Sequence, residues 1–128
     1  MFKSVSAARG VEGEERALQH LQRQGLKLVQ RNYRVARGPG ARAGEIDLIL
    51  RDRDGTLVFV EVRSRAGAAP GGGFGGAAAS VGAAKRRSLV YAAQHYLQRL
   101  ASPPPCRFDV VAIDGEHIEW LPAAFDTN

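Results

Sequence analysis

Cysteine is nearly absent from this chain. Cys106 is the single cysteine among 128 residues, which excludes an intramolecular disulfide and leaves no cysteine-based zinc site. This usage fits a reducing compartment, and we expect Cys106 to be a small buried apolar residue. His20, His95 and His117 stand far apart without ligand spacing, so no histidine-based zinc site is expected either.

Long apolar runs are also missing. No stretch approaches the length of a membrane span, and the N-terminus has no continuous apolar region of the kind found in secretory signals. We therefore expect a cytoplasmic protein that does not associate with membranes. A chain of 128 residues that is 45% hydrophobic can build one core but not two, so we predict a single domain over residues 1–128.

Acidic residues are missing from one segment of the chain. The segment 26–43 contains no Asp or Glu but holds Lys27, Arg31, Arg34, Arg37 and Arg42. The tail after Phe108 has the opposite bias, since it contains no Lys or Arg. With 18 basic and 13 acidic residues the net charge is +5, which favours an anionic partner such as nucleic acid. A basic protein without such a partner is the alternative.

Periodicity and turn residues predict an α/β domain. We expect a helix over 12–24, a strand over 26–35, a hairpin of strands 44–50 and 56–63, a helix over 80–100 that Ser80 caps, and strands 108–113 and 117–121. Residues 66–79 are almost wholly Gly, Ala and Pro, which predicts a flexible loop. The order αβββαββ implies a central mixed β-sheet flanked by helices.

Two acids occupy the predicted hairpin. Alternation puts Asp47 on one face with Glu45 and Ile49, and in the second strand Glu61 shares a face with Arg63. A three-residue loop of residues 53–55 places Asp47 directly opposite Glu61. A two-residue loop would instead place Asp47 opposite Val62, so the register decides whether the acids meet.

Two carboxylates on one face repel each other unless a cation or a proton neutralises them. Mg²⁺ or Mn²⁺ would suit Asp47 and Glu61, and Arg63 would return to that face to hold a phosphate. The alternative is an ordinary hairpin in which Asp47 pairs with Arg63 without metal. Glu14 lies on the apolar stripe of the first helix, where it is either a helix-dipole partner or a third member of the site.

The motifs together resemble a known family. They are Gly13-Glu14, Arg31-Asn32-Tyr33-Arg34, Gly44-Glu45-Ile46-Asp47-Leu48-Ile49, Val58-Phe59-Val60-Glu61-Val62-Arg63-Ser64-Arg65 and Arg107-Phe108-Asp109-Val110-Val111. This pattern resembles the YraN family of bacterial proteins, which are predicted endonucleases similar to the PD-(D/E)xK nucleases, including archaeal Holliday junction resolvases. The resemblance extends from about residue 10 to residue 125.

The resemblance implies a restriction-endonuclease-like fold and a set of roles. Glu14 would be the helix-borne acid, which binds through water, while Asp47 and Glu61 would be the metal ligands. Arg63 stands where the family most often has Lys. This departure matters because Arg stays protonated and cannot serve as a base.

We therefore predict a metal-dependent endonuclease that hydrolyses phosphodiester bonds in DNA, including branched or structured DNA, with Mg²⁺ or Mn²⁺. A catalytically silent module of the same fold that binds nucleic acid without cutting is the main alternative, and a scaffold for another protein is the third. A homodimer would suit symmetric cleavage, although the sequence does not prove one. The predicted nucleic-acid contacts are Arg31, Arg34, Arg37, Arg42, Arg65, Lys85 and Arg86.

Three of the remaining polar residues have competing interpretations. Lys85 either runs along the buried stripe toward the acids or lies on the surface, and Arg86 is either a phosphate contact or plain solvated charge. Asp109 is either a partner for a basic residue or a peripheral acid of the site.

Overall fold

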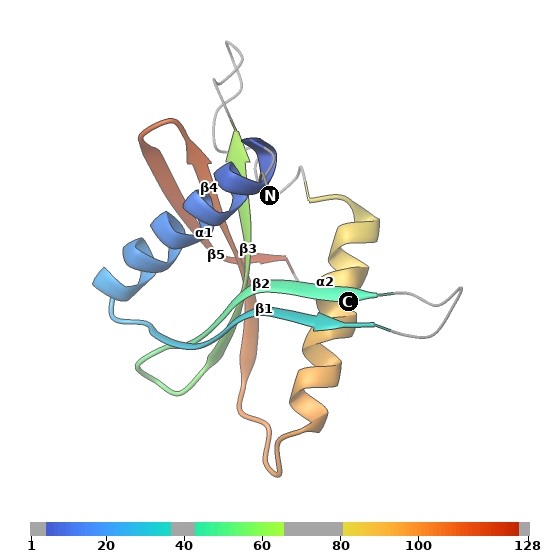
Figure 1. The fold of residues 1–128 in the computed structure, drawn as a ribbon. Helices are drawn as coiled ribbons and strands as arrows, with labels where there is room; N and C mark the ends of the chain where they lie inside the picture. Colours follow the sequence, from blue (N-terminus) through green and yellow to red (C-terminus); the bar gives the residue numbers. More distant parts are fainter. Residues whose placement is uncertain (1–4, 37–42, 66–80, 126–128) are drawn as a thin grey trace.

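The computed structural model describes residues 5–36, 43–65 and 81–125 (Figure 1). Its elements are α1 (Val5–Arg23), β1 (Lys27–Val35), β2 (Gly44–Arg51), β3 (Leu57–Arg65), α2 (Ala83–Gln98), β4 (Cys106–Asp114) and β5 (His117–Phe125). The expected order of helices and strands is thus confirmed. The loop predicted at 66–79 lies outside the described residues.

The strands form one mixed five-stranded sheet in the order β1-β2-β3-β4-β5. β3 and β4 are parallel and α2 connects them, whereas the other neighbours are antiparallel. The sheet is strongly twisted, so that β1 and β2 cross the direction of β3 and β4 in Figure 1. The predicted α/β architecture with a central mixed sheet is confirmed at this level.

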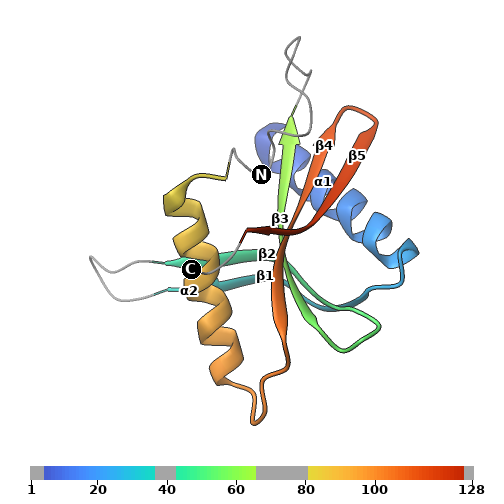
Figure 2. The same ribbon diagram turned by 180° about the vertical axis from the view of Figure 1, so that it is seen from behind.

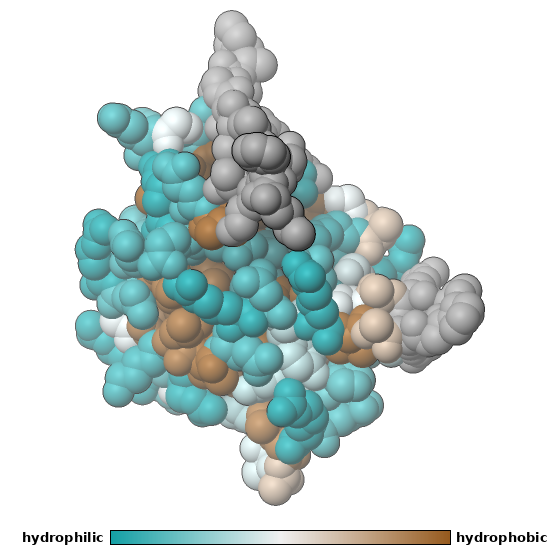
Figure 3. All heavy atoms as spheres, in the orientation of Figure 1, coloured by the Kyte–Doolittle hydropathy of each residue, from teal (hydrophilic) through white to brown (hydrophobic). Residues whose placement is uncertain are grey.

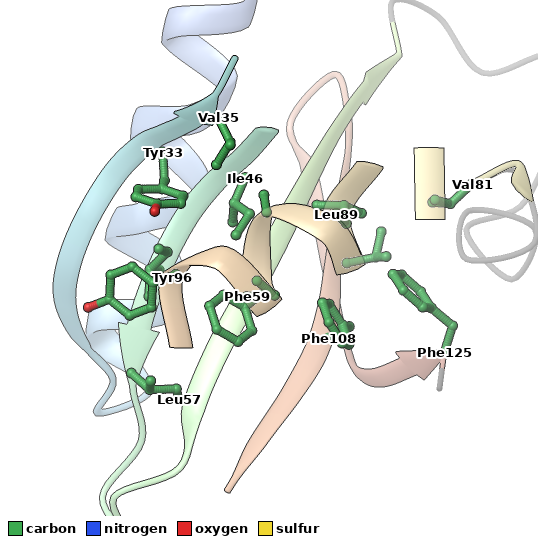
Figure 4. Packing of buried hydrophobic residues seen from close by; sticks show 14 residues of the cluster. Tyr33, Val35, Ile46, Leu57, Phe59, Val81, Leu89, Tyr96, Phe108 and Phe125 are labelled. Atoms are coloured by element: carbon green, nitrogen blue, oxygen red, sulfur yellow. The ribbon is translucent and has the colours of Figure 1, made fainter. Parts of the chain in front are cut away.

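The two helices cover opposite faces of the sheet, as Figures 1 and 2 show. Ala17, Leu18 and Leu21 of α1 pack on one face against Leu48 and Val60. The other face carries the α2 cluster, in which aromatic rings follow one another beneath the helix (Figure 4). The successive ring contacts run through Tyr33, Tyr96, Phe59, Phe108 and Phe125.

The helix α2 buries the residues expected of it but begins later than predicted. Leu89, Ala92, Ala93 and Tyr96 are buried. Its N-cap is Gly82 in an extended conformation without a side-chain cap, so the assignment of Ser80 as N-cap was wrong. The helix starts only after the chain has buried Val81, and a Cβ added to Gly82 would meet no atom within 4 Å.

The hairpin between β2 and β3 has the register of the three-residue loop. Leu48 pairs with Val60 and Arg51 with Leu57, and the amide of Asp52 donates to the carbonyl of Thr56 at 2.9 Å. Gly55 has a φ of 89°, the left-handed conformation that this loop needs. Asp47 and Glu61 are therefore the next facing positions beyond the last pair of the ladder.

Strict alternation fails along β2, contrary to the sequence interpretation. Ile46 and Ile49 both pack in the cluster under α2, while Leu48 packs under α1. Two residues of opposite parity can share a face only if the strand rotates between them, and the rotation occurs around Asp47.

Cys106 is exposed, so its assignment as a buried residue was wrong. It begins β4 at the end of the sheet rather than inside it.

The surface is mostly hydrophilic on the face that Figure 3 shows, with a brown area where α1 ends and β1 begins. Leu28 and Val29 of β1 are exposed. Within the described residues, no helix is long and apolar enough to cross a membrane.

Candidate metal centre

The candidate site follows one line across three strands. Arg31 pairs with Leu48 and Tyr33 with Ile46, so Asn32 stands opposite Asp47 between them. The ladder between β2 and β3 ends at Leu48 and Val60, and Asp47 and Glu61 are the positions directly beyond that pair. The sheet thus brings an amide and two carboxylates into adjacent positions on β1, β2 and β3.

Asp47 is half-buried and bonds to the neighbouring backbone. Its Oδ2 accepts a hydrogen bond of 2.8 Å from the amide of Val62. The carboxylate therefore replaces a backbone carbonyl at the point where the β2–β3 ladder ends. Burial raises the pKa of Asp47, while this hydrogen bond and the charge of Lys85 lower it.

Glu61 is the most perturbed group of the site. It is only 4% exposed, and its Oε2 has no hydrogen-bond partner among the described residues. Its Oε1 lies 3.6 Å from Nζ of Lys85. Burial, followed by the negative charge of Asp47, raises the pKa of Glu61 to about 8, and the charges of Lys85 and Arg63 only partly oppose this.

Glu14 reaches the same region from α1. It is half-buried, and burial and then the charge of Asp47 raise its pKa, whereas a hydrogen bond from Asn32 lowers it. In the orientation that satisfies both groups, the amide nitrogen of Asn32 lies 3.2 Å from each carboxylate oxygen of Glu14. The charge of Asp47 thus acts on both of the other predicted acids, Glu14 and Glu61.

The two cations of the site come from different elements. Arg63 is half-buried on β3, and its charge lowers the pKa of Glu61. No Arg63–Asp47 ion pair occurs among residues 43–65 and 81–98, contrary to the metal-free hairpin considered above. Lys85 of α2 instead extends to Glu61, which resolves its two interpretations in favour of the acidic site.

The donor set fits a hard divalent cation. Two carboxylates suit Mg²⁺ or Mn²⁺, since Mg²⁺ usually takes one or two of them and keeps several waters. The orphaned Glu61 Oε2 is an unused acceptor of this type beside Asp47. Among the described residues no group of three or more His, Cys, Asp or Glu side chains is placed to hold a metal ion, so Asp47 and Glu61 would need waters or substrate oxygens to complete the coordination.

Most of the predicted nucleic-acid contacts that are described already have partners within the chain. Arg31 pairs with Glu15, and Arg34 lies 3.4 Å from Glu45. Arg86 donates to the carbonyl of Val81 at 3.0 Å and lies over the ring of Phe125. Its role is therefore at least partly structural. Arg37, Arg42 and the side chain of Arg65 lie outside the described residues.

Asn32 is the residue that sequence reasoning missed. It lies in the quoted motif Arg31-Asn32-Tyr33-Arg34, but no role was given to it. The available signal was an Asn inside a strand pattern, because Asn is depleted in strands and enriched in left-handed conformations. Its φ is indeed positive, at 50°.

Asp109 belongs to a separate structural network. Its Oδ1 accepts from Nε of Arg107 at 3.1 Å and from the amide of Ala123 at 2.9 Å, and its Oδ2 accepts from Nε1 of Trp120 at 2.8 Å. Arg107 also binds Asp52 at 2.8 Å. The interpretation of Asp109 as a partner for a basic residue is confirmed.

Comparisons with known proteins agree with the sequence motifs. A model of the uncharacterised protein family UPF0102 matches residues 13–113. A UPF0102 protein of Methylibium petroleiphilum is 67% identical over 97% of this chain and 98% of its own length. Another, from Paracidovorax citrulli, is 62% identical over 98% of this chain and 88% of its own. A third, from Cupriavidus taiwanensis, is 58% identical over 99% and 92%.

Proposed function

Because this chain belongs to the uncharacterised protein family UPF0102, the YraN family, whose description names no activity, we propose from its own residues that it is a metal-dependent endonuclease acting on DNA. The proposal includes a restriction-endonuclease-like fold. The mixed sheet supports it, with acids on the hairpin strands β2 and β3 and a parallel partner strand β4 reached through α2.

A single observation carries the proposal, namely the orphaned Oε2 of Glu61 beside Asp47. A buried carboxyl with an unused oxygen costs free energy, and the neighbouring Asp47 further disfavours its ionised form, so the pKa of Glu61 is raised to about 8. Such an arrangement is typical of a site that receives a cation. Lys85 supplies only one positive charge to Glu61, at 3.6 Å, and leaves the second oxygen unused.

The residues divide the chemistry among themselves. Asp47 and Glu61 would hold Mg²⁺ or Mn²⁺, which supplies Lewis-acid polarisation of the phosphoryl oxygens. Glu14 would accept a hydrogen bond from a water on the α1 side and orient it. Arg63 and Lys85 would bind non-bridging phosphate oxygens, where negative charge grows as water attacks phosphorus and the bond to the leaving oxygen breaks.

A second candidate is a module that binds nucleic acid without cutting it, and Arg63 motivates this alternative. Arginine cannot deprotonate water, so the strand position itself offers no base. A divalent cation held by Asp47 and Glu61 would answer this objection, since such an ion acidifies water and makes a side-chain base unnecessary. We therefore favour the endonuclease.

The decisive experiment is cleavage of a substrate panel by the full chain. Labelled single-stranded, duplex, flap and four-way-junction DNA, and RNA, would be incubated with Mn²⁺ or Mg²⁺. Asp47→Ala and Glu61→Gln should each reduce cleavage by about 100-fold or more while retaining binding. Glu12→Gln is the control, since Glu12 is an exposed acid of α1.

Each outcome has a definite meaning. Equal cleavage by wild type, Asp47→Ala and Glu61→Gln would overturn the site. Salt-dependent binding without cleavage, unchanged by metal, would support the binding module. A preference for four-way junctions together with a dimeric mass would extend the proposal to a homodimer that cuts symmetrically.

A further inference from the structure

Asn32 has an unusual backbone for a residue inside a strand. Its φ of 50° is left-handed, yet the residues on both sides remain paired with β2. Such conformations cost free energy and persist where the surrounding structure determines them. Asparagine tolerates this conformation better than most residues. The distortion is confined to the position opposite Asp47.

The side chain of Asn32 meets Glu14. Its amide nitrogen lies 3.2 Å from both carboxylate oxygens, and an ionised carboxylate can only accept hydrogen bonds, so the NH₂ group must face it. One amide in contact with both oxygens fixes the plane of the carboxylate. Asn32 thereby selects the orientation in which Glu14 faces the site.

The helix α1 is held close on its other side as well. A Cβ added to Gly13 would lie 2.4 Å from Oγ of Ser64 on β3, so only glycine allows this approach without a shift. Gly13 thus sets the distance of the helix from β3, and the amide of Asn32 holds the next residue from β1. Glu14 is positioned from both directions.

We propose that Asn32 is a positioning residue that orients the Glu14 carboxylate toward Asp47 for metal binding. The proposal rests on the endonuclease function above. A purely structural contact would have no need of an acid here, because Glu14 and Asp47 raise each other's electrostatic cost. The contact holds Glu14 near Asp47 despite their mutual repulsion, which binding of a cation would relieve.

The test uses variants that separate backbone from side chain. Asn32→Gly keeps the left-handed backbone but removes the amide, and Glu14→Gln removes the negative charge that the amide orients. Mn²⁺ affinity of the full chain, measured by calorimetry, should fall about tenfold in each. The double variant should fall no further, because both changes remove one interaction. Glu12→Gln is the control, an exposed acid on the same helix.

A second readout does not depend on metal or activity. The side-chain amide resonance of Asn32 in a ¹⁵N spectrum should move in Glu14→Gln and stay in place in Glu12→Gln. An unmoved resonance in Glu14→Gln would overturn the contact itself. Urea unfolding of Asn32→Gly distinguishes the roles, since lost stability with wild-type Mn²⁺ affinity would make Asn32 merely structural and overturn the proposal.

Failure of the underlying function has a different signature. If wild type and Asp47→Ala bind Mn²⁺ equally, the metal centre is wrong whatever Asn32 does. If Asp47→Ala loses Mn²⁺ while Asn32→Gly binds it like wild type, the centre stands and the positioning role is overturned.

Discussion

Glu61 and Asp109 are both buried acids on the parallel strands β3 and β4, yet their surroundings differ. Asp109 is 0% exposed, and both oxygens accept hydrogen bonds from Arg107, Trp120 or Ala123. Glu61 is 4% exposed, but its Oε2 has no partner in the described residues. Two buried carboxyl groups in neighbouring strands thus differ, because both oxygens of Asp109 accept hydrogen bonds whereas one oxygen of Glu61 accepts none.

The difference shows how a buried charge can be assigned a role. A carboxylate whose acceptors are all used stabilises the fold, and removing it leaves its donors unpaired. A carboxylate with an unused oxygen and a raised pKa costs stability, which is typical of functional sites. Asp109 therefore has a structural role, whereas the surroundings of Glu61 favour a role in the proposed site.

Of the changes considered, removal of the fully hydrogen-bonded Asp109 should lower the free energy of unfolding most. Asp109→Ala removes the acceptor for Nε1 of Trp120 and the amide of Ala123 and leaves Arg107 half-paired, so the free energy of unfolding should fall by about 3–5 kcal/mol. Urea denaturation at neutral pH measures this. A loss below about 1 kcal/mol would contradict the assignment to the scaffold.

Glu61→Gln should raise the free energy of unfolding rather than lower it, and the effect should depend on pH. The pKa of Glu61 is about 8 in the folded protein, above the ordinary 4.5. Between these values the folded protein retains a proton that the unfolded chain has released, so the contribution of Glu61 to stability is fully present below pH 4.5 and is lost as the pH rises through about 8. Glutamine cannot ionise and should avoid this loss.

Unfolding in urea at pH 5 and pH 8.5 tests the sign. The variant should match wild type at pH 5 and exceed it by about 1–3 kcal/mol at pH 8.5 without metal. Comparing the two proteins at each pH cancels the titration of all other groups. If Glu61→Gln is less stable than wild type at pH 8.5, then Glu61 stabilises the fold as Asp109 does, and the difference between the two acids does not hold.

Trp120→Phe sharpens the comparison by removing one donor from Asp109. The ring is kept, but Oδ2 then has only Nε of Arg107 at 3.3 Å. The free energy of unfolding should fall by about 1 kcal/mol. Ile118→Val, a conservative change on the same strand β5, is the control. A loss as large as that of Asp109→Ala would mean that packing of the indole, not the hydrogen bond, dominates.

Lys85→Met should change stability least, by less than about 1 kcal/mol, since the lysine is about one-third exposed. Its stem is preserved, but the charge that lowers the pKa of Glu61 is lost. The pKa of Glu61 should therefore rise further, as a ¹³C titration of its carboxyl would show. Arg87→Met, an exposed cation of the same helix, should leave that pKa unchanged.

Local sequence signals were sufficient for the elements and for part of the site. Alternating apolar residues and the Asp54-Gly55 turn predicted the hairpin, and its loop length predicted that Asp47 faces Glu61. These inferences succeeded because strand pairing across a short turn depends on neighbouring residues only. The same alternation failed at Ile46, where β2 rotates beside the left-handed Asn32 of another strand.

The sequence by itself determined the αβββαββ order and membership of the UPF0102 family, whereas the structure decided between the two hairpin registers that the sequence allowed. Only the tertiary structure decided which charges meet: Lys85 with Glu61, Asn32 with Glu14, and Arg107 with Asp109. The physical reason is distance along the chain. Periodicity reports which face a side chain takes, whereas a contact between α2 and β3 depends on how a helix packs on a twisted sheet, which no local pattern encodes.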